Sequence, residues 1–263
     1  MDKKLEKKTN NKNVIAVCGK GGVGKTAFTA MLARCLKESQ KAGNLLIVDA
    51  DPAMGLPNTM GITVNKTIGD IRNLIIDTAR NGFEADQIEL SQKLDYLVFD
   101  TLYEDDGMAF LAMGRTDSQG CFCSVNDLLK KSIGILSENF DTILIDGEAG
   151  LEQINRQVMS MVDTLVILTD TSARGLQTVE HIKKMITEEK VLDCNKFGVV
   201  FNRVTNNQSL LEQAAEKIGI DVLGMIPQDD KIAEYDLMGV PLVDLPEDSR
   251  ALNDVREIVK NIL

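Results

Sequence analysis

The sequence lacks tryptophan, contains a single histidine, His181, and has few aromatic residues, which make up 4% of its 263 residues. One histidine excludes a histidine-rich metal site and a two-histidine catalytic arrangement within one chain. Acidic residues outnumber basic ones by 40 to 29, which gives a net charge of −11. This balance argues against a nucleic-acid-binding protein, because such proteins neutralise phosphates with lysine and arginine. No stretch approaches the ~20 consecutive apolar residues of a membrane span.

The N-terminal residues 1–12 carry five lysines but lack the apolar segment of a secretory signal. We therefore expect a flexible basic tail, followed by one domain over residues 13–263. A chain without a signal is expected in the cytoplasm, where reduced cysteines serve as buried apolar side chains, metal ligands or nucleophiles. The cysteines are Cys18, Cys35, Cys121, Cys123 and Cys194. We expect Cys18 and Cys35 in the core, and His181 on a solvated helix face.

Short apolar runs alternate with longer amphipathic segments, which is typical of βαβ units and a parallel sheet. We expect strands at 14–17, 45–48, 94–99, 142–145, 165–168, 197–201 and 222–226, and helices at 25–39, 67–80, 174–188, 207–218 and 249–262. The pattern predicts a single-domain α/β fold with a mostly parallel sheet of about seven strands flanked by helices on both faces. The glycine-rich motif in the following segment predicts that this fold is a P-loop NTPase. Residues 100–120 show no clear period, and we interpret them as a long functional loop.

A glycine-rich segment follows the first expected strand and reads Gly19-Lys20-Gly21-Gly22-Val23-Gly24-Lys25-Thr26. Its glycines fit the dinucleotide motif G-x-G-x-x-G, with Asp49 placed as the ribose-binding acid. The segment also completes the triphosphate motif G-x-x-x-x-G-K-[ST], and a dinucleotide-binding turn has no need of Lys25 and Thr26. A triphosphate does need them, because the lysine reaches the β and γ oxygens and the threonine ligates Mg²⁺. We expect the phosphates of ATP to lie against the backbone of Gly21, Gly22, Val23, Gly24, Lys25, Thr26 and Ala27.

Two of the expected strands end in aspartate, the second at Asp49 and the fourth at Asp146. The carboxyl edge of a parallel sheet borders the ligand crevice, where carboxylates can hold Mg²⁺ or orient an attacking water. We expect Asp49 to hold Mg²⁺ through water, and Asp146 to act as the Walker B acid beside the Mg²⁺ shell. For Asp49 and the nearby Asp51, a cap of the following helix or turn is the alternative interpretation.

Cys121-Phe122-Cys123 ends the long segment, so we place a metal-binding loop at about 100–124. In an extended segment the side chains at i and i+2 point to the same face, so both sulfurs can approach one ion. Two thiolates leave a metal half-ligated, whereas a homodimer supplies the four that suit Zn, an Fe–S cluster or another soft metal. Ser124 and Asp127 predict the N-terminus of a helix that runs through Leu136 and favours thiolate over thiol. An incidental or oxidisable cysteine pair is the alternative.

The segment Lys20-Gly21-Gly22-Val23-Gly24-Lys25-Thr26 resembles the deviant phosphate loop of the MinD/ParA/nitrogenase-iron-protein class of ATPases. The resemblance implies an ATPase that closes as a homodimer on ATP, with Lys20 reaching the nucleotide of the partner. It also implies that Asp51 positions the attacking water.

Two later segments, Asn202-Arg203-Val204 and Ile226-Pro227-Gln228-Asp229, resemble the adenine-binding segments of this class. The resemblance implies that the Asn202 amide pairs with the base. Ordinary turns at strand ends are the alternative for both segments.

The segment Asp146-Gly147-Glu148-Ala149-Gly150-Leu151-Glu152 resembles the CooC type, the nickel-insertion accessory ATPases of carbon monoxide dehydrogenase. That subfamily also carries Cys-x-Cys between its third and fourth strands, but commonly has histidine where this chain has Gln153. The resemblance implies an ATP-dependent metallochaperone that binds Ni²⁺ or Zn²⁺ and serves an apo-enzyme of the carbon monoxide dehydrogenase or acetyl-CoA synthase type.

Two other functions remain open at this point. One is a reductase component that carries a [4Fe–4S] cluster between subunits, and the other is a MinD/ParA-like positioning ATPase on a membrane or DNA. The segment 248–263 has equal numbers of basic and acidic residues and no aromatic one, unlike a membrane-binding helix. We therefore expect it to be a packed final helix, and we expect neither membrane nor nucleic-acid binding.

Overall fold

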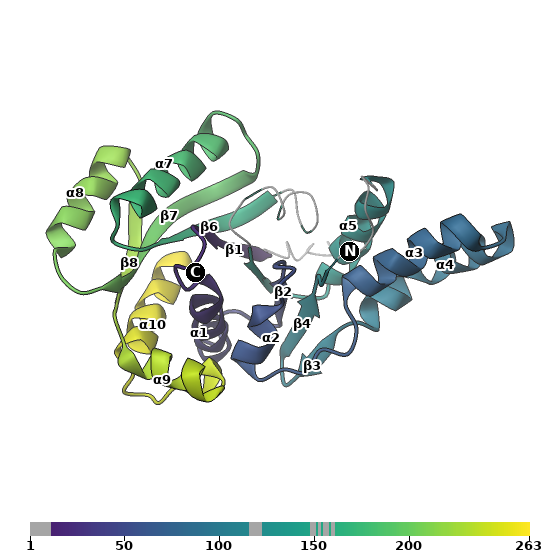
Figure 1. Ribbon diagram of the computed structural model, residues 1–263, viewed down its shortest axis with the longest axis horizontal. Helices are drawn as coiled ribbons and strands as arrows, with labels where there is room; N and C mark the ends of the chain where they lie inside the picture. Colours follow the sequence, from purple (N-terminus) through teal and green to yellow (C-terminus); the bar gives the residue numbers. More distant parts are fainter. Residues whose placement is uncertain (1–11, 116–122, 148–150, 152–153, 155–157, 159–160) are drawn as a thin grey trace, which may run out of the picture.

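The computed structural model describes residues 12–115, 123–147, 151, 154, 158 and 161–263. These residues form an eight-stranded sheet in the order β3-β4-β2-β5-β1-β6-β7-β8 (Figure 1). The strands are β1 Asn13–Gly19, β2 Leu45–Asp49, β3 Tyr103–Asp105, β4 Met108–Ala112, β5 Thr142–Asp146, β6 Met161–Thr169, β7 Asp193–Val204 and β8 Asp221–Pro227. Neighbouring strands are parallel, apart from the antiparallel pair β3–β4.

Helices cover both faces of the sheet. They are α1 Lys25–Glu38, α2 Gly55–Met60, α3 Ile68–Asn81, α4 Glu84–Phe99, α5 Cys123–Ser137, α7 Ala173–Thr187, α8 Gln208–Ile218, α9 Asp230–Met238, α10 Arg250–Ile262 and the short 3₁₀ helix η2 Leu242–Asp244. The α/β fold with a mostly parallel, helix-flanked sheet is confirmed. The short helices α2 and α9 were not predicted.

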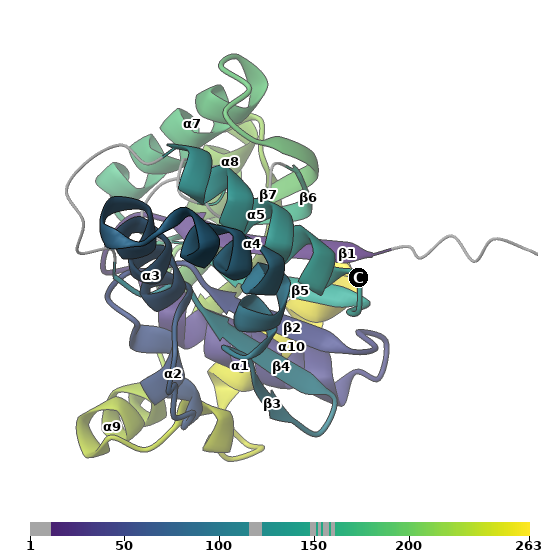
Figure 2. The ribbon, with the colours of Figure 1, turned by 90° about the vertical axis from the view of Figure 1, so that its right-hand side faces the viewer.

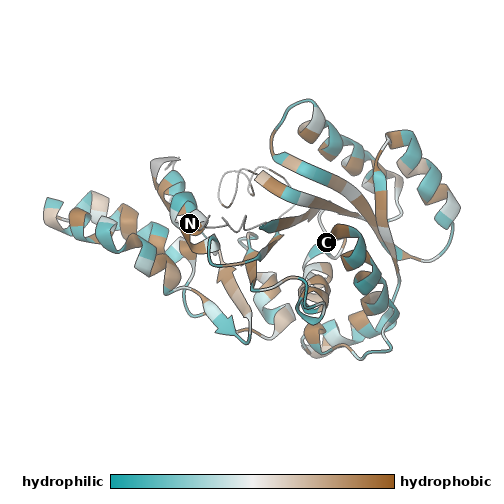
Figure 3. Ribbon diagram, turned by 180° about the vertical axis from the view of Figure 1, so that it is seen from behind, coloured by the Kyte–Doolittle hydropathy of each residue, from teal (hydrophilic) through white to brown (hydrophobic). Residues whose placement is uncertain are grey.

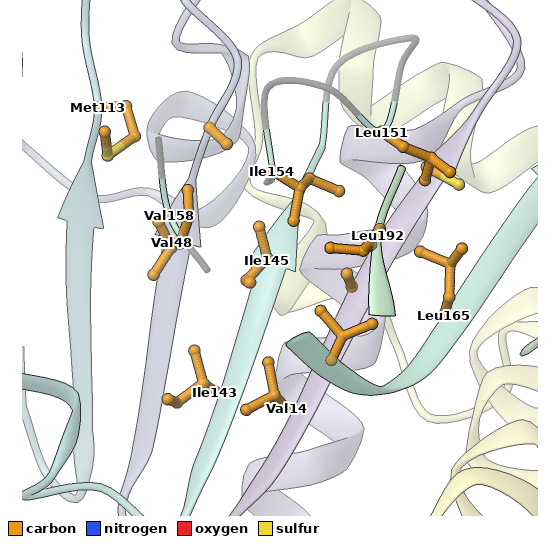
Figure 4. Packing of buried hydrophobic residues seen from close by; sticks show 14 of the residues in the cluster. Val14, Val48, Met113, Ile143, Ile145, Leu151, Ile154, Val158, Leu165 and Leu192 are labelled. Carbon is orange, nitrogen blue, oxygen red and sulfur yellow. The ribbon is translucent and has the colours of Figure 1, made fainter. Parts of the chain in front are cut away.

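Alternating side chains of the strands enter two separate cores. Ala16 and Cys18 of β1 pack with residues of α3, α4, α5, α7 and α8, whereas Ile15 and Val17 pack with α1, α2, η2 and α10. Figure 4 shows part of the first core, and Figure 3 shows the apolar strands lying between the helices. Because both faces are covered, the strands read as continuous apolar runs in the sequence.

The expected strand at 94–99 is wrong, since these residues form the last turns of α4. Leu94 and Val98 are buried four residues apart, whereas Tyr96 and Phe99 are 67% and 51% exposed. A run in which five of six residues are apolar is compatible with a strand or a helix, but this spacing of the buried residues is helical. Helices α3, α4 and α5 pack together, and α3 and α4 project from the sheet as an arm (Figures 1 and 2).

Residues 100–120 are not a loop throughout. Tyr103–Asp105 and Met108–Ala112 form the hairpin β3–β4, whose two strands join six of the expected ones to make the eight-stranded sheet. The turn consists of Asp106 and Gly107, which have φ angles of 26° and 76°. Positive φ at both positions is typical of a two-residue hairpin turn, and Asp-Gly is a strong sequence signal for it.

Several smaller expectations are confirmed. Thr67 and Asp70 form a capping box at the start of α3, with Thr67 N donating to Asp70 Oδ2 over 2.8 Å. Cys18 and Cys35 are buried, and His181 is exposed. The apolar side of α10 is buried against α1 and β8. Among the residues that the structure describes, no helix has the length and apolar character needed to cross a membrane.

Candidate functional site

The phosphate loop joins β1 to α1 at the carboxyl edge of the sheet. Gly19 ends β1 with φ of 141°, and a Cβ at this position would lie 2.0 Å from the carbonyl oxygen of Leu168 in β6. Gly24 has a left-handed φ of 89° and precedes the first residue of α1. These two conformations direct the loop over the N-terminus of α1, where backbone N–H groups and the helix dipole favour anions.

The two lysines of the loop have partners within the same chain. Lys25 Nζ donates to the carbonyl oxygen of Lys20 over 3.2 Å, and Lys20 Nζ lies 3.1 Å from Asp170 Oδ2. Although burial raises the pKa of Asp170, hydrogen bonds from Ser172 and Lys20 hold it below its ordinary value. Sequence reasoning missed Asp170, which directly follows β6 at the same edge as the other aspartates. The signal that indicated Asp49 and Asp146, an acid at the end of an apolar run, is also present at Asp170.

Asp49 and Asp146 lie side by side, because the parallel register of β2 and β5 pairs them. Both side chains are buried, and burial is the main reason that the pKa of Asp49 rises to about 7 and that of Asp146 to about 6. The neighbouring charges of Asp146 and Asp51 raise the pKa of Asp49 further. Hydrogen bonds from Thr29 and Thr26 partly offset the effect of burial on Asp146.

One carboxylate oxygen of the pair Asp49 and Asp146 has no hydrogen-bond partner in the described part of the chain. Asp49 Oδ1 accepts from the backbone N–H of Asp51 over 3.0 Å, and Asp146 Oδ1 accepts from Thr29 Oγ1 over 3.0 Å. Asp49 Oδ2 is buried and has no hydrogen-bond partner within the described part of the chain. A buried carboxylate oxygen without a partner is costly unless a cation compensates it, and Mg²⁺ prefers oxygen ligands of this kind. The residues present therefore fit a magnesium ion.

Asp51 lies beyond β2 and is half-buried. Its Oδ1 accepts from the backbone N–H of Ala53 over 2.8 Å, so it also caps the turn that leads into α2. The role as a turn cap and the expected role in orienting water are compatible, because a carboxylate has further lone pairs to offer.

The expected base-binding residues contact the phosphate loop. Asn202 Nδ2 donates to the Val23 carbonyl over 2.8 Å, and its Oδ1 accepts from the Arg203 backbone N–H over 2.9 Å. Arg203, with φ of 57°, places Nη1 3.4 Å from the Gly22 carbonyl oxygen. Pro227 ends β8 beside Val204 of β7. These contacts join the end of β7 to the phosphate loop, and base recognition by Asn202 stays a prediction.

The predicted thiolate site lies largely outside the described residues. Cys121 and the side chain of Cys123 are not described, nor are Glu148, Gly150 and Gln153. Helix α5 begins at Cys123, one residue before the expected cap Ser124, and ends at Ser137. Within the ranges that are described, no group of three or more His, Cys, Asp or Glu is arranged to hold a metal ion.

The chain is similar to two proteins over most of its length. An ATP-binding protein of Methanocaldococcus jannaschii is 42% identical over 255 residues, which cover 95% of this chain and 98% of that protein. The carbon monoxide dehydrogenase accessory protein CooC of Rhodospirillum rubrum is 29% identical over 243 residues, which cover 88% and 89% of the two chains.

Among solved structures, the septum site-determining protein MinD of Pyrococcus horikoshii, complexed with Mg-ADP, has the same fold. It superimposes with a TM-score of 0.67 at 24% identity, covering 95% of each chain. Residues 14–242 match the family described as the CobQ/CobB/MinD/ParA nucleotide binding domain. The chain therefore belongs to this family and is one of its ATP-binding, P-loop members.

Proposed function

We propose that this protein is an ATP-dependent metallochaperone that hydrolyses ATP as a homodimer and delivers a soft transition metal to an apo-metalloenzyme. The observation that carries the proposal is the pair Cys121 and Cys123 in a chain of an ATP-binding family. The similarity to a carbon monoxide dehydrogenase accessory protein supports nickel as the cargo, and an enzyme of the carbon monoxide dehydrogenase or acetyl-CoA synthase type as the client. Zn²⁺ is the other ion that such thiolates bind readily.

ATP binding in this proposal uses the loop between β1 and α1. The backbone N–H groups of residues 21–27 hold the phosphates, and Lys25 exchanges its contact with the Lys20 carbonyl for the β and γ oxygens. Asp49, through water, Asp146 and Thr26 would hold Mg²⁺, which when bound neutralises phosphate charge and polarises the transferred phosphoryl group. Asp51 orients the attacking water, and Asn202, Arg203 and Pro227 border the base.

Dimer formation in this proposal depends on Lys20. Its ammonium group leaves Asp170 and contacts the nucleotide of the partner. The ion pair that it leaves has side chains 33% and 32% exposed, and such half-exposed pairs contribute little to stability. The free energy lost when Lys20 leaves Asp170 for a phosphate is therefore small.

Metal binding in this proposal requires two chains. Each chain contributes the thiolates of Cys121 and Cys123, and four thiolates complete the tetrahedral set of a soft metal. Helix α5 begins at Cys123, and its N-terminus favours the thiolate form. ATP and metal each favour the closed dimer, and hydrolysis opens it and releases the ion to the client.

One described feature weighs against the positioning ATPase on a membrane. The apolar residues of α10, among them Leu252, Val255 and Ile258, are buried against the rest of the domain. A membrane-binding helix presents its apolar face to lipid instead. We expect no association with liposomes or DNA in the presence of ATP.

An anaerobic metal titration tests the proposal. The intact protein, supplied with Ni²⁺ or Zn²⁺ and a non-hydrolysable ATP analogue, should bind about one ion per two chains, as four shared thiolates require. The double variant Cys121→Ser, Cys123→Ser should lose this binding, whereas Cys194→Ser on β7 is the matched control and should retain it. Unchanged stoichiometry in the double variant contradicts the proposal. Isolation with stoichiometric iron and a cluster absorbance would favour the reductase instead.

A further inference from the structure

Thr29 of α1 lies one turn after Thr26 and is completely buried. Its hydroxyl donates to Asp146 Oδ1 over 3.0 Å and so connects α1, the helix that follows the phosphate loop, to the end of β5. Threonine within a helix commonly bonds a carbonyl of the preceding turn. The bond from Thr29 instead crosses to the sheet.

Thr29 lies between two apolar residues in the sequence. Its neighbours Phe28 and Ala30 are buried in the core between α1 and the sheet. Valine has nearly the shape of threonine and would fill such a position without a polar atom to satisfy. A buried hydroxyl here is thus explained by the carboxylate that it contacts and not by the packing.

The orientation of the Asp146 carboxylate needs to be fixed by a contact. The terminal torsion of an aspartate has broad minima, so its side chain does not set the plane of its own oxygens. Threonine, in contrast, is stiff at χ1 because it is branched at Cβ. A hydrogen bond from a stiff donor on a helix therefore holds one carboxylate oxygen in place and determines where the other one points.

We propose that Thr29 is a positioning residue for the magnesium site, because its hydroxyl holds Asp146 Oδ1 and so fixes the orientation of the second carboxylate oxygen. The inference rests on the proposed role of Asp146 beside Mg²⁺. Thr26, the expected Mg²⁺ ligand, lies one turn before Thr29 on the same helix. Asp49, with its unpartnered Oδ2, completes the site from β2.

The experiment measures how the binding of a fluorescent ATP analogue depends on Mg²⁺ in the full chain. Thr29→Val removes the donor and keeps the shape, and Thr29→Ser keeps the donor. The valine variant should need roughly tenfold more Mg²⁺ for half-maximal binding, since a hydrogen bond to a charged group is lost. The serine variant should stay within about twofold of the unaltered protein, as its donor is retained. Thr187→Val on the exposed end of α7 is the matched control.

A second measurement separates positioning from a general loss of structure. Binding of the same analogue in excess chelator uses the phosphate loop without Mg²⁺, and it should be equal in all the chains. Thr29→Ala provides a second donor-free variant in case the valine chain does not fold. Equal Mg²⁺ dependence in the valine, serine and unaltered chains overturns the role of Thr29 alone, as does an equal loss in the valine and serine chains. If the binding of the ATP analogue to the unaltered protein does not depend on Mg²⁺, the proposed magnesium site itself is overturned.

Discussion

Lys20 of the phosphate loop and Asp170 at the end of β6 form an ion pair within one chain, with 3.1 Å between Nζ and Oδ2. Asp170 also accepts from the backbone N–H of Ser172 over 3.0 Å, so its carboxylate is held in place at the start of α7. If Lys20 serves the nucleotide of a second copy, Asp170 competes with that nucleotide for the same ammonium group. The pair then favours the open monomer.

Asp170→Asn should strengthen ATP-dependent dimerisation. Asparagine keeps the oxygen that accepts from the Ser172 backbone N–H but removes the charge that holds Lys20. Because a half-exposed ion pair contributes up to about 1 kcal/mol, the dissociation constant of the dimer should fall by about two- to fivefold. Sedimentation with a non-hydrolysable ATP analogue measures this constant. Lys20→Ala is the companion variant, and we expect it to bind nucleotide as a monomer; weaker dimerisation of Asp170→Asn would contradict the competition.

Lys25→Ala should lose most of its affinity for ATP. The lysine supplies a charge-assisted bond to the phosphates, so its removal should weaken binding by roughly ten- to a hundredfold. Calorimetric titration with ATP and Mg²⁺ measures the effect. The exposed Lys41, which lies after the end of α1, provides the control, and Lys41→Ala should bind as tightly as the unaltered protein. An unchanged affinity of Lys25→Ala for ATP would mean that the phosphates do not bind at this loop.

Asp49 makes the metal-free protein less stable as the pH rises. Its pKa is about 7 in the folded chain, against about 3.9 for an ordinary aspartate in the unfolded one. Between these values the folded chain keeps a proton that the unfolded chain releases, so the free energy of unfolding falls as the pH rises. Urea unfolding without Mg²⁺ should show a contribution of Asp49 to this loss on the order of 2 kcal/mol between about pH 4.5 and 7.5. The loss should be smaller by that amount in Asp49→Asn, where only Asp146, with its pKa of about 6, remains. The same slope in both chains would refute a raised pKa at Asp49.

Two glycines of the phosphate loop should respond differently to alanine. In Gly19→Ala the new Cβ would meet the Leu168 carbonyl oxygen at 2.0 Å, at a φ of 141° that alanine rarely adopts. We expect destabilisation of about 3 kcal/mol or more, because backbone strain and a clash combine. In Gly21→Ala the Cβ would have no neighbour within 4 Å, and the free energy of unfolding should change little. Chemical unfolding compares the two variants, and an unaffected Gly19→Ala would contradict the close packing of β1 against β6.

The sequence predicted the parts of the fold that rest on local patterns. The phosphate loop, the capping box of Thr67 and Asp70, and the aspartates at the ends of β2 and β5 each have a short signal with a fixed structural meaning. The run at 94–99 had no such signal, since its five apolar residues fit either a buried strand or a buried helix turn. The packing of α4 against α3 and α5 determined the outcome, and packing between distant segments is not visible in one run.

The sequence indicated where candidate site residues lie along the sheet edge, but not which contacts they make. Asp49 and Asp146 were both expected at the carboxyl edge, but their direct pairing depends on the register of β2 and β5. Thr29 and Asp170 were missed because each acts through a partner far away in the sequence. A single hydroxyl in an apolar helix gives no sign of the carboxylate that it meets.

Strand β3 has a consequence for how two copies can meet. It is only three residues long, it carries the exposed acids Glu104 and Asp105, and it ends the sheet in an antiparallel hairpin. Short, charged edge strands resist the addition of another strand. The β3 edges of two copies therefore do not favour pairing into a continuous sheet. Repulsion between the acids of the two β3 strands keeps these edges apart. The homodimer of the proposed function is therefore expected to form through another surface.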